Sequence, residues 1–392
     1  MPALILAERY VKQKKAASLS GVHLAACLHV SKETAVLVSS LHSLGMDVHL
    51  VAANPLSSQG EIARYLSSTG VKVSGRRGES AAEYHAEIRK VASSSPDMIV
   101  DDGGELHVAY SKTGLGSCFG GTDETTSGTQ RLLALEQMGL LRYPVIPINE
   151  ASMKHLFDNK YGTGQSSLDG LLRATGLLLA GKSIVVAGYG WVGKGVAMRA
   201  RGLGARVIVT EVDPVHALEA HLDGYDVMPM DSAVPQGDVF LTCTGQADVL
   251  TGKHFAQMKD GAILGNCGHF DREINVRALS SIASHPKRVR ENVQEYRIGA
   301  KSIHLLCEGR VVNLVSAEGH PPEVMQLSFA AQLLSLYYLA GHRSDLKNSK
   351  KRVLSVPREI DDLVASFALQ AFKLKIDRLT GKQRRYARTF NR

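Results

Sequence analysis

The sequence contains few cysteines, and their positions form no recognisable pattern. Cys27, Cys118, Cys243, Cys267 and Cys307 are scattered along 392 residues, without a CxxC pair or a Cys/His cluster. An odd number of unclustered cysteines argues against a disulfide framework, and we expect no metal site.

The chain also lacks a long, purely apolar run. At the N-terminus, MPALILAERYVKQKK places charged residues before a signal-peptide core could form. The longest uncharged stretch, 324–341, contains Gln326, Ser328, Gln332 and Ser335, which predicts an amphipathic helix and not a membrane span. We therefore expect a cytoplasmic protein with no membrane partner.

Outside residues 341–392 the chain has no excess of basic residues. The net charge is +8, but this last segment holds 14 Lys and Arg against 5 Asp and Glu, which leaves 32 basic and 33 acidic residues elsewhere. A basic tail on a neutral body is typical of a solvated or subunit-contacting helix, so we do not expect a nucleic-acid partner. The length suits two or three folded domains.

Helical patterns alternate with short apolar runs up to about residue 150. HVSKETAVLVSSLHSLG predicts a helix that ends at Gly45, and MDVHLVAAN predicts the strand that follows. PDMIVDDGGE predicts a strand that stops at an acidic, glycine-rich loop. This alternation is typical of an open α/β sheet, which binds ligands at the carboxyl ends of its strands.

The segment KSIVVAGYGWVGKGVAMRARGLGARVIVTEVDP predicts a dinucleotide-binding unit. A β-branched strand (183–187) leads into Gly188-Tyr189-Gly190-Trp191-Val192-Gly193, and a helix and a second strand ending at Glu211 follow. The glycines allow a tight turn and close approach of the backbone to a pyrophosphate at the helix N-terminus. Because a carboxylate at Glu211 accepts hydrogen bonds from ribose hydroxyls and repels a 2′-phosphate, we expect NAD and not NADP.

Lys154 and Asp158 are four residues apart and would share one helix face. A lysine beside a carboxylate can exchange a proton with an alcohol that is being oxidised. On spacing alone, an ordinary surface ion pair is the simpler interpretation. For His29, His269 and His320 the simpler interpretation is also structural, because a single histidine is more often structural than catalytic.

Taken together, the motifs of this chain resemble those of the S-adenosylhomocysteine hydrolase family. FDNKYG, AGYGWVGKG, TEVDP and NCGHFDREI occur in the family's order, within a likeness that runs from about Cys27 to Tyr386. The resemblance implies a tightly bound NAD that oxidises the nucleoside 3′-hydroxyl and so acidifies the C4′ proton. The 5′ thiol then leaves, water adds, and the ketone is reduced to give adenosine and homocysteine.

The resemblance also implies roles for individual residues. Lys154 and Asp158 would handle the 3′-hydroxyl proton, and Asp102, His29 and His269 would act at the C4′ and 5′ positions. The residues expected to bind the cofactor are Gly188, Gly190, Trp191, Val192, Gly193, Glu211, Thr125, Thr126, Ser127, Asn159, Asn266 and Asn313. The residues expected to bind the nucleoside substrate are Glu124, at the ribose hydroxyls, and Ser31, Glu33, Gln59, His320 and Met325.

Several positions depart from the family pattern. Ser31, Thr163 and Trp191 stand where Thr, Cys and Asp are usual, and Glu318 replaces an apolar Met. A carboxylate buried beside the base would be costly without a facing donor, so Glu318 raises the question of a changed purine preference. The final LTGKQRRYARTFNR is shorter than the family's terminal segment, which places a Lys and a Tyr near a neighbouring subunit's NAD.

The expected fold is α/β, with two doubly wound, largely parallel-sheet domains. Residues 1–155 and the return helices 320–352 would form the substrate domain, 156–319 an inserted Rossmann NAD domain, and 353–392 a basic C-terminal helix or tail. The substrate would lie in the cleft between the domains, and hinges near 150–160 and 318–325 would allow closure. A homo-oligomer, a tetramer or dimer, is implied by the resemblance.

Two alternatives stay open at this point. The same 3′-oxidation could act on a different nucleoside, as an epimerase, lyase or variant thioether hydrolase. The chain could also be a relative that binds NAD without turnover.

Overall fold

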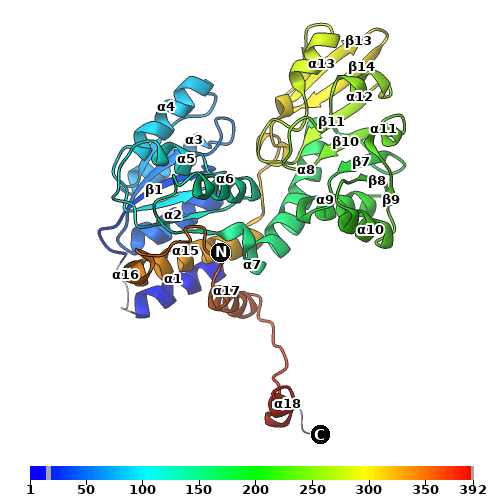
Figure 1. The fold of residues 1–392 in the computed structure, drawn as a ribbon. Helices are drawn as coiled ribbons and strands as arrows, with labels where there is room; N and C mark the ends of the chain where they lie inside the picture. Colours follow the sequence, from blue (N-terminus) through cyan, green and yellow to red (C-terminus); the bar gives the residue numbers. More distant parts are fainter. Residues whose placement is uncertain (15–18, 390–392) are drawn as a thin grey trace.

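Two α/β domains lie side by side in the computed structural model, which describes residues 1–14 and 19–389 (Figure 1). The chain passes between them twice. It crosses first through α7 (Ser152–Lys154), a π-helix (His155–Thr163) and α8 (Gly164–Thr175), and it returns through the segment between α14 (Val312–Val315) and α15 (Pro322–Gly341). The last three residues of the expected tail lie outside the described residues.

The first domain is built on a six-stranded parallel sheet with strand order β3-β2-β1-β4-β5-β6. Its strands are β1 (His23–Leu28), β2 (Asp47–Ala52), β3 (Lys72–Ser74), β4 (Met98–Asp101), β5 (Gly120–Asp123) and β6 (Val145–Pro147). This order reverses between β1 and β4, which is where open α/β sheets bind ligands. The sheet therefore presents the ends of β1, β4 and β5 to the second domain.

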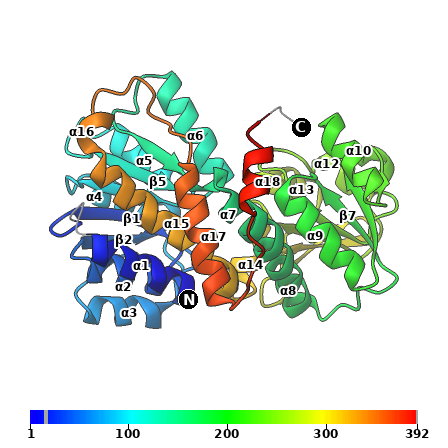
Figure 2. The same ribbon diagram turned by 90° about the horizontal axis from the view of Figure 1, so that it is seen from below.

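Helices cover both faces of this sheet. One core joins the sheet to α1 (Pro2–Lys14), α2 (Lys32–Ser43), α15 and α17 (Arg358–Ala371). The other joins it to α4 (Ala81–Ala92), α5 (Glu105–Ser111) and α6 (Thr126–Gln137). The remaining helical segments here are α3 (Gly60–Ser68), a 3₁₀ turn (Ile148–Glu150) and α16 (Arg343–Leu346). From below, α17 lies along the seam between the domains (Figure 2).

The second domain contains an eight-stranded sheet with strand order β12-β13-β14-β11-β10-β7-β8-β9. Its parallel strands are β7 (Ser183–Ala187), β8 (Arg206–Thr210), β9 (Asp226–Val227), β10 (Val239–Thr242), β11 (Ala262–Asn266) and β14 (Lys301–Leu306). An antiparallel extension consists of β12 (Lys287–Arg290) and β13 (Val293–Ile298). The expected fold of two doubly wound, largely parallel domains is confirmed.

The helical segments of this domain follow the Rossmann alternation. They are α9 (Trp191–Gly202), α10 (Pro214–Leu222), α11 (Met230–Ala233), α12 (Gly252–Gln257), α13 (Val276–Ile282) and a 3₁₀ turn (Cys307–Gly309). A short helix, α18 (Gly381–Tyr386), follows an exposed segment without regular secondary structure and projects away from both domains (Figure 1).

Helix α15 differs from the amphipathic helix that its sequence predicted. Gln326, Ser328, Gln332 and Ser335 are all buried, at 2% exposure or less, and most of the helix is enclosed by the first domain. By length and composition alone α15 could cross a membrane, but its burial is that of a domain's central core helix. The prediction of an amphipathic helix was wrong because these polar side chains are buried like the apolar ones.

The π-helix packs against α9 at a contact that only glycine allows. A Cβ on Gly195 would overlap the carbonyl group of Lys160, and a Cβ on Gly164 would crowd the backbone of Gly195. The crossing of the chain into the second domain is therefore held by backbone-to-backbone packing.

We expect Gly195→Ala to lower the free energy of unfolding by about 2 kcal/mol, because the methyl group must push the π-helix away from α9. Urea denaturation followed by circular dichroism would measure the change. Gly202→Ala is the matched control, since a Cβ there meets nothing within 4 Å and α9 should gain up to about 1 kcal/mol. Equal stability of the two variants would contradict this packing argument.

Candidate active site

A cavity of about 340 Å³ lies between the two domains and contains most of the predicted site residues. From the first domain come residues at the ends of β1, β4 and β5, and from the second come the N-terminus of α9 and the loop after β11. The predicted residues that line it are His29, Ser31, Glu33, Asp102, Glu124, Thr125, Thr126, Ser127, Lys154, Asp158, Asn159, Gly190, Trp191, Val192, His269, Asn313, His320 and Met325.

Five predicted residues do not line this cavity. Gly188 (φ +94°) makes the tight turn after β7, and Gly193 packs against its carbonyl group. The Glu211 carboxylate accepts hydrogen bonds from the backbone N–H groups of Tyr189 and Val212, both at 2.6 Å. The remaining two, Gln59 and Asn266, have their own local contacts. Gln59 donates its backbone N–H to Val30.

The side chain of Asn266 is used within the loop that follows β11. Its amide donates to the carbonyl oxygens of Gly268, Phe270 and Gly309, and its oxygen accepts from the N–H of Gly268. The residue therefore shapes the loop that carries His269.

The ammonium group of Lys154 lies at the centre of a buried polar cluster. Its Nζ donates to Asn159 Oδ1 at 2.7 Å and lies 3.4 Å from Asp158 Oδ1 and 3.9 Å from Glu124 Oε1. The predicted proximity of Lys154 and Asp158 is confirmed, although the backbone after Lys154 follows the wider turn of a π-helix. Such π-helical turns occur frequently at functional sites.

Groups on α15 and its preceding loop complete this cluster. Ser328 donates to Asp158 Oδ2 at 2.8 Å, and Gln332 donates to Glu124 Oε2 at 2.6 Å. His320 Nδ1 lies 3.0 Å from Asp158 Oδ1. One carboxylate of the cluster thus faces a lysine, a histidine and a hydroxyl, while Glu124 faces the lysine at longer range.

These surroundings separate the pKa values of the two carboxyls. Burial would raise the pKa of Asp158, but the charges of Lys154 and His320 and its hydrogen bonds hold it below its ordinary value. Burial raises the pKa of Glu124 to about 8, with Lys154 opposing the shift. Burial would lower the pKa of Lys154, but the charges of Asp158 and Glu124 raise it. The cluster therefore contains an ion pair next to a carboxyl that readily holds a proton.

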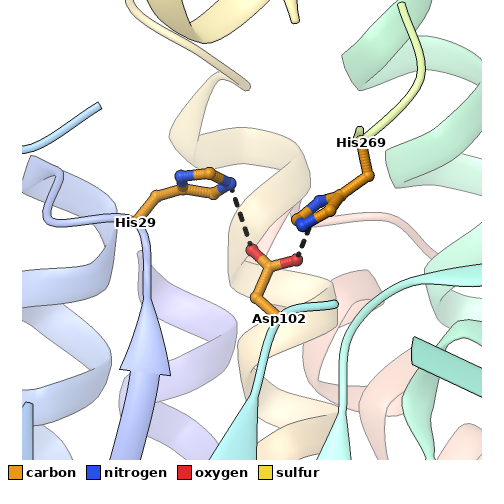
Figure 3. A group of neighbouring side chains, drawn as sticks. All are labelled: His29, Asp102 and His269. Atoms are coloured by element: carbon orange, nitrogen blue, oxygen red, sulfur yellow. Dashed lines mark ion pairs between the residues drawn. The ribbon is translucent and has the colours of Figure 1, made fainter. Parts of the chain in front are cut away.

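Asp102 also lines the cavity and lies between two imidazoles that come from different domains (Figure 3). His29 Nε2 is 3.4 Å from Asp102 Oδ2, and His269 Nδ1 is 3.7 Å from Asp102 Oδ1. The other nitrogen of His29 contacts Ser57 Oγ at 2.6 Å. Burial lowers the pKa of His29 to about 4 and lowers that of His269 as well, so both rings are uncharged near neutral pH.

Two uncharged imidazoles and a carboxylate are also potential metal ligands. The three ligand atoms of His29, Asp102 and His269 lie within 4.8 Å of one another. The group could thus hold a transition-metal cation. The absence of a metal from the working enzyme stays a prediction.

Gly103 lets the two domains meet at this point. It has φ +109°, and a Cβ would overlap the ring of His269. Arg131, on α6, donates to the Gly103 carbonyl at 3.0 Å, and its guanidinium lies 4.2 Å from the centre of the Phe270 ring. The loop of the second domain is therefore held directly against the Asp102 loop.

The N-terminus of α9 fits a dinucleotide pyrophosphate. Gly190, Trp191 and Val192 line the cavity where the first N–H groups of the helix lack helical partners. A Cβ on Gly190 would meet nothing within 4 Å, which leaves open space for a ligand beside the backbone. Both this geometry and the carboxylate of Glu211 suit NAD.

The departures from the family pattern have identifiable contacts. Thr163 Oγ1 lies 3.1 Å from His320 Nε2, and the Trp191 ring stacks on His155 at 4.8 Å between centres. The expectation of a costly buried Glu318 was wrong. Its side chain is 56% exposed and pairs with Lys32 at 3.1 Å and Arg173 at 3.5 Å.

Sequence reasoning missed several supporting residues. Ser328 and Gln332 stood out only as polar residues in an apolar run, which was the available signal. Ser57 and Arg131 lie in ordinary polar stretches and gave no signal of their own.

Comparisons with known proteins agree with this geometry. Residues 1–115 match the family described as S-adenosyl-L-homocysteine hydrolase, and residues 159–319 match its NAD binding domain. The fold, though not the sequence, is also similar to that of a dipicolinate synthase from Bacillus halodurans, with a TM-score of 0.52 at 14% identity over 82% of this chain and 99% of that one.

Relatives with assigned names are similar over nearly the whole chain. The adenosylhomocysteinase of Aeropyrum pernix is 51% identical over 94% of this chain and 89% of its own length, and that of Aquifex aeolicus is 48% identical over 98% and 92%. The S-inosyl-L-homocysteine hydrolase of Methanocaldococcus jannaschii is 47% identical over 98% and 92%. The chain therefore belongs to the S-adenosyl-L-homocysteine hydrolase family.

Proposed function

We propose that this protein hydrolyses S-adenosyl-L-homocysteine to adenosine and homocysteine, with NAD bound to the second domain. The observation that carries the proposal is that three groups line one cavity. They are the Lys154 cluster, the His29–Asp102–His269 group and the N-terminus of α9. The names of its relatives support the same reaction.

Residues of both domains would hold the cofactor. Bound NAD supplies a reversible two-electron oxidation of the nucleoside 3′-hydroxyl. The turn 188–193 would hold the pyrophosphate, and Glu211 would accept from the adenosine ribose of the cofactor. The residues that would surround the nicotinamide end are Thr125, Thr126, Ser127, Asn159 and Asn313.

Lys154 and its neighbours would accept and return the proton of the 3′-hydroxyl. A hydroxyl bound beside Nζ can release its proton into the Lys154–Asp158–Glu124 cluster as its carbon is oxidised, and can take it back in the final reduction. Asn159 orients the ammonium group, and Ser328 and Gln332 orient the two carboxylates. The cluster would also bind the ribose hydroxyls through Glu124.

The second group would act at the C4′ and 5′ positions. Once the 3′ carbon is a ketone, the C4′ proton is acidic and can pass to the Asp102 carboxylate. Elimination then breaks the 5′ carbon–sulfur bond, and the proton taken up by Asp102 can pass through an adjacent uncharged imidazole to the departing thiolate. Water added at the same carbon can return its proton to His29 or His269, which are uncharged and able to accept it.

The choice of purine base is a second, narrower question. Ser31, Glu33, His320 and Met325 line the cavity and would contact the base. The Glu33 carboxylate could accept the amino group of adenine or the N1–H of hypoxanthine. The similarity to an S-inosyl-L-homocysteine hydrolase favours testing both thioethers.

We further propose a homo-oligomer, as a dimer or tetramer. Leu374, Ile376, Leu379 and Tyr386 are at least 59% exposed on the C-terminal segment that projects from the protein (Figure 1). Apolar side chains on such an arm are typical of a subunit contact. A cytoplasmic location without nucleic-acid or membrane partners stays a prediction.

We expect Lys154→Met to abolish the rise in absorbance near 340 nm that reports reduced nicotinamide when adenosine is added. The expected loss of homocysteine release is at least 1,000-fold, about 4 kcal/mol of transition-state stabilisation. Lys253→Met makes the same chemical change at an exposed lysine paired with Asp231, and it should behave like the wild type. Unchanged nicotinamide reduction in Lys154→Met would contradict the role given to this residue.

We expect S-adenosyl-L-homocysteine to release homocysteine at a higher kcat/KM than S-inosyl-L-homocysteine. Mass spectrometry of the free thiol would measure both rates in parallel, with NAD⁺ supplied. A preference for the inosyl compound would retain the mechanism but contradict the proposed substrate. If neither compound releases thiol, the proposed function is contradicted.

The buried His29 predicts a pH-dependent stability. Its folded pKa of about 4 lies below the unfolded value near 6.5, so between these limits the unfolded chain binds more protons. The free energy of unfolding should therefore fall as the pH drops from 6.5 to 4, by about 3 kcal/mol more in the wild type than in His29→Asn. Urea titrations at several pH values would show this, and parallel curves would contradict it.

A further inference from the structure

Asp101 and Asp123 are two buried carboxyl groups that directly precede Asp102 and Glu124 in the chain. They have no part in the chemistry described above. Strands β4 and β5 end in the doublets Asp101-Asp102 and Asp123-Glu124, and Asp101 is in register with Asp123. Side chains alternate along a strand, so Asp102 and Glu124 line the cavity while Asp101 and Asp123 are fully buried. The two buried carboxyls are therefore neighbours.

Asp101 has the surroundings of an ionised carboxylate. Its Oδ1 accepts the backbone N–H of Asp102 at 2.9 Å, and its Oδ2 accepts the N–H of His107 at 2.9 Å. Each oxygen is thus occupied by a donor, which favours the charged form.

Asp123 has different surroundings at its two oxygens. Oδ1 accepts the backbone N–H of Thr125 at 2.9 Å and lies 3.3 Å from the hydroxyl of Thr125. Oδ2 is buried without a hydrogen-bond partner among the described residues. Gly128 is required here, because a Cβ would overlap the Asp123 carboxyl group.

The imidazole of His107, which lies near both carboxyls, is not a cation. Its Nε2 lies 3.2 Å from the Thr122 carbonyl oxygen, which can only accept, so this nitrogen carries hydrogen. Its Nδ1 lies 2.8 Å from the Tyr143 hydroxyl and accepts from it. Burial lowers the pKa of His107 to about 4, in agreement with an uncharged ring.

Among the described residues, no cationic side chain is paired with either of these two carboxyls. The ligand atoms of Asp101, His107 and Asp123 lie within 4.8 Å of one another, and no lysine or arginine in residues 1–14 and 19–389 forms an ion pair with either carboxyl. The remaining ionisable neighbours are uncharged or acidic, namely Cys27, Asp102, Glu105, Glu124 and Tyr143. Two like charges so close in a buried site cannot both persist.

We propose that Asp123 retains a proton at neutral pH on Oδ2, the oxygen that faces no donor, while Asp101 is ionised, so that the two buried acids carry one negative charge. Asp101 then serves as a positioning residue, whose two backbone hydrogen bonds fix the loop that presents Asp102 to His29 and His269. Burial, followed by the charge of Asp101, raises the pKa of Asp123 well above its ordinary value. Burial also raises the pKa of Asp101, to about 7, against its two backbone donors.

The retained proton has a consequence for Asp102. A second negative charge beneath this loop would add to the negative potential at Asp102, and a neutral Asp123 removes that contribution. This consequence rests on the proposed function, whereas the proton itself can be observed without substrate.

The direct test is infrared spectroscopy of protein whose aspartate side-chain carboxyls are labelled with ¹³C, at pH 7 and without substrate. The carbonyl stretch of a protonated aspartic acid should be present, should shift to lower frequency in D₂O, and should be absent from Asp123→Asn. The ¹³C label separates this band from that of protonated Glu124. If no protonated aspartate is found in the wild type, the proposal is wrong, whether or not the protein hydrolyses its substrate.

Two isosteric variants test the asymmetry of the pair. Asn in place of Asp123 keeps an acceptor at Oδ1 and is neutral, so Asp123→Asn should retain kcat within about threefold. Asp101→Asn places an NH₂ group against a backbone N–H and so removes one of the two hydrogen bonds that hold the Asp102 loop. We therefore expect kcat to fall at least 30-fold and the acid limb of the pH profile of kcat to move. KM should be less affected. Equal losses in the two variants would overturn the proposal. If Asp123→Asn does not fold, the infrared spectrum of the labelled wild type still shows whether a protonated aspartate is present.

Discussion

The burial of one lysine ammonium group between two carboxyl groups, of which Asp158 is the ionised partner, is the constraint on which the site depends. Removing Lys154 from water is unfavourable unless its charge is matched, and breaking a buried pair of this kind typically costs about 3–5 kcal/mol. Three separate elements supply the matching groups: Asp158 from the π-helix, Glu124 from the end of β5, and the hydrogen-bonding side chains of α15 that hold both carboxylates. The electrostatics of this cluster therefore tie the crossing segment to the first domain's sheet and core helix.

The second requirement is that both domains contribute to a single cavity. His269 belongs to the second domain, yet it lies against Asp102 of the first (Figure 3). It also lies against Gly103, and Arg131 contacts Phe270 across the same boundary. Neither domain alone brings two imidazoles to the Asp102 carboxylate. The Lys154 cluster and the Asp102 group therefore line the same cavity, and Asp102 and Glu124 follow the ends of two adjacent strands.

Features that depend on local sequence were predictable, whereas contacts between distant segments were not. The glycine turn and its flanking strands could be predicted because a strand, a tight turn and a helix N-terminus are adjacent in the chain. The contact of Lys154 with Asp158 followed from spacing, although the π-helical backbone did not. Ser328 lies 170 residues from Asp158, so its contact required the fold. Glu318 was misjudged because neither its exposure nor its pairing with Lys32 and Arg173, which come from other elements, can be derived from the local sequence. The doublets at the ends of β4 and β5 likewise acquire distinct roles only through their register.

In the proposed reaction, oxidation at the 3′ carbon must precede loss of the thiol. The most direct test is to compare homocysteine release from S-adenosyl-L-homocysteine with release from its 3′-deoxy analogue, using the same NAD-loaded protein and mass spectrometry. The account predicts rapid release from the natural compound and none above background from the analogue, whose binding is verified by competition. Release from the 3′-deoxy compound at a comparable rate would contradict it, because the Lys154 cluster would then have no proton to accept.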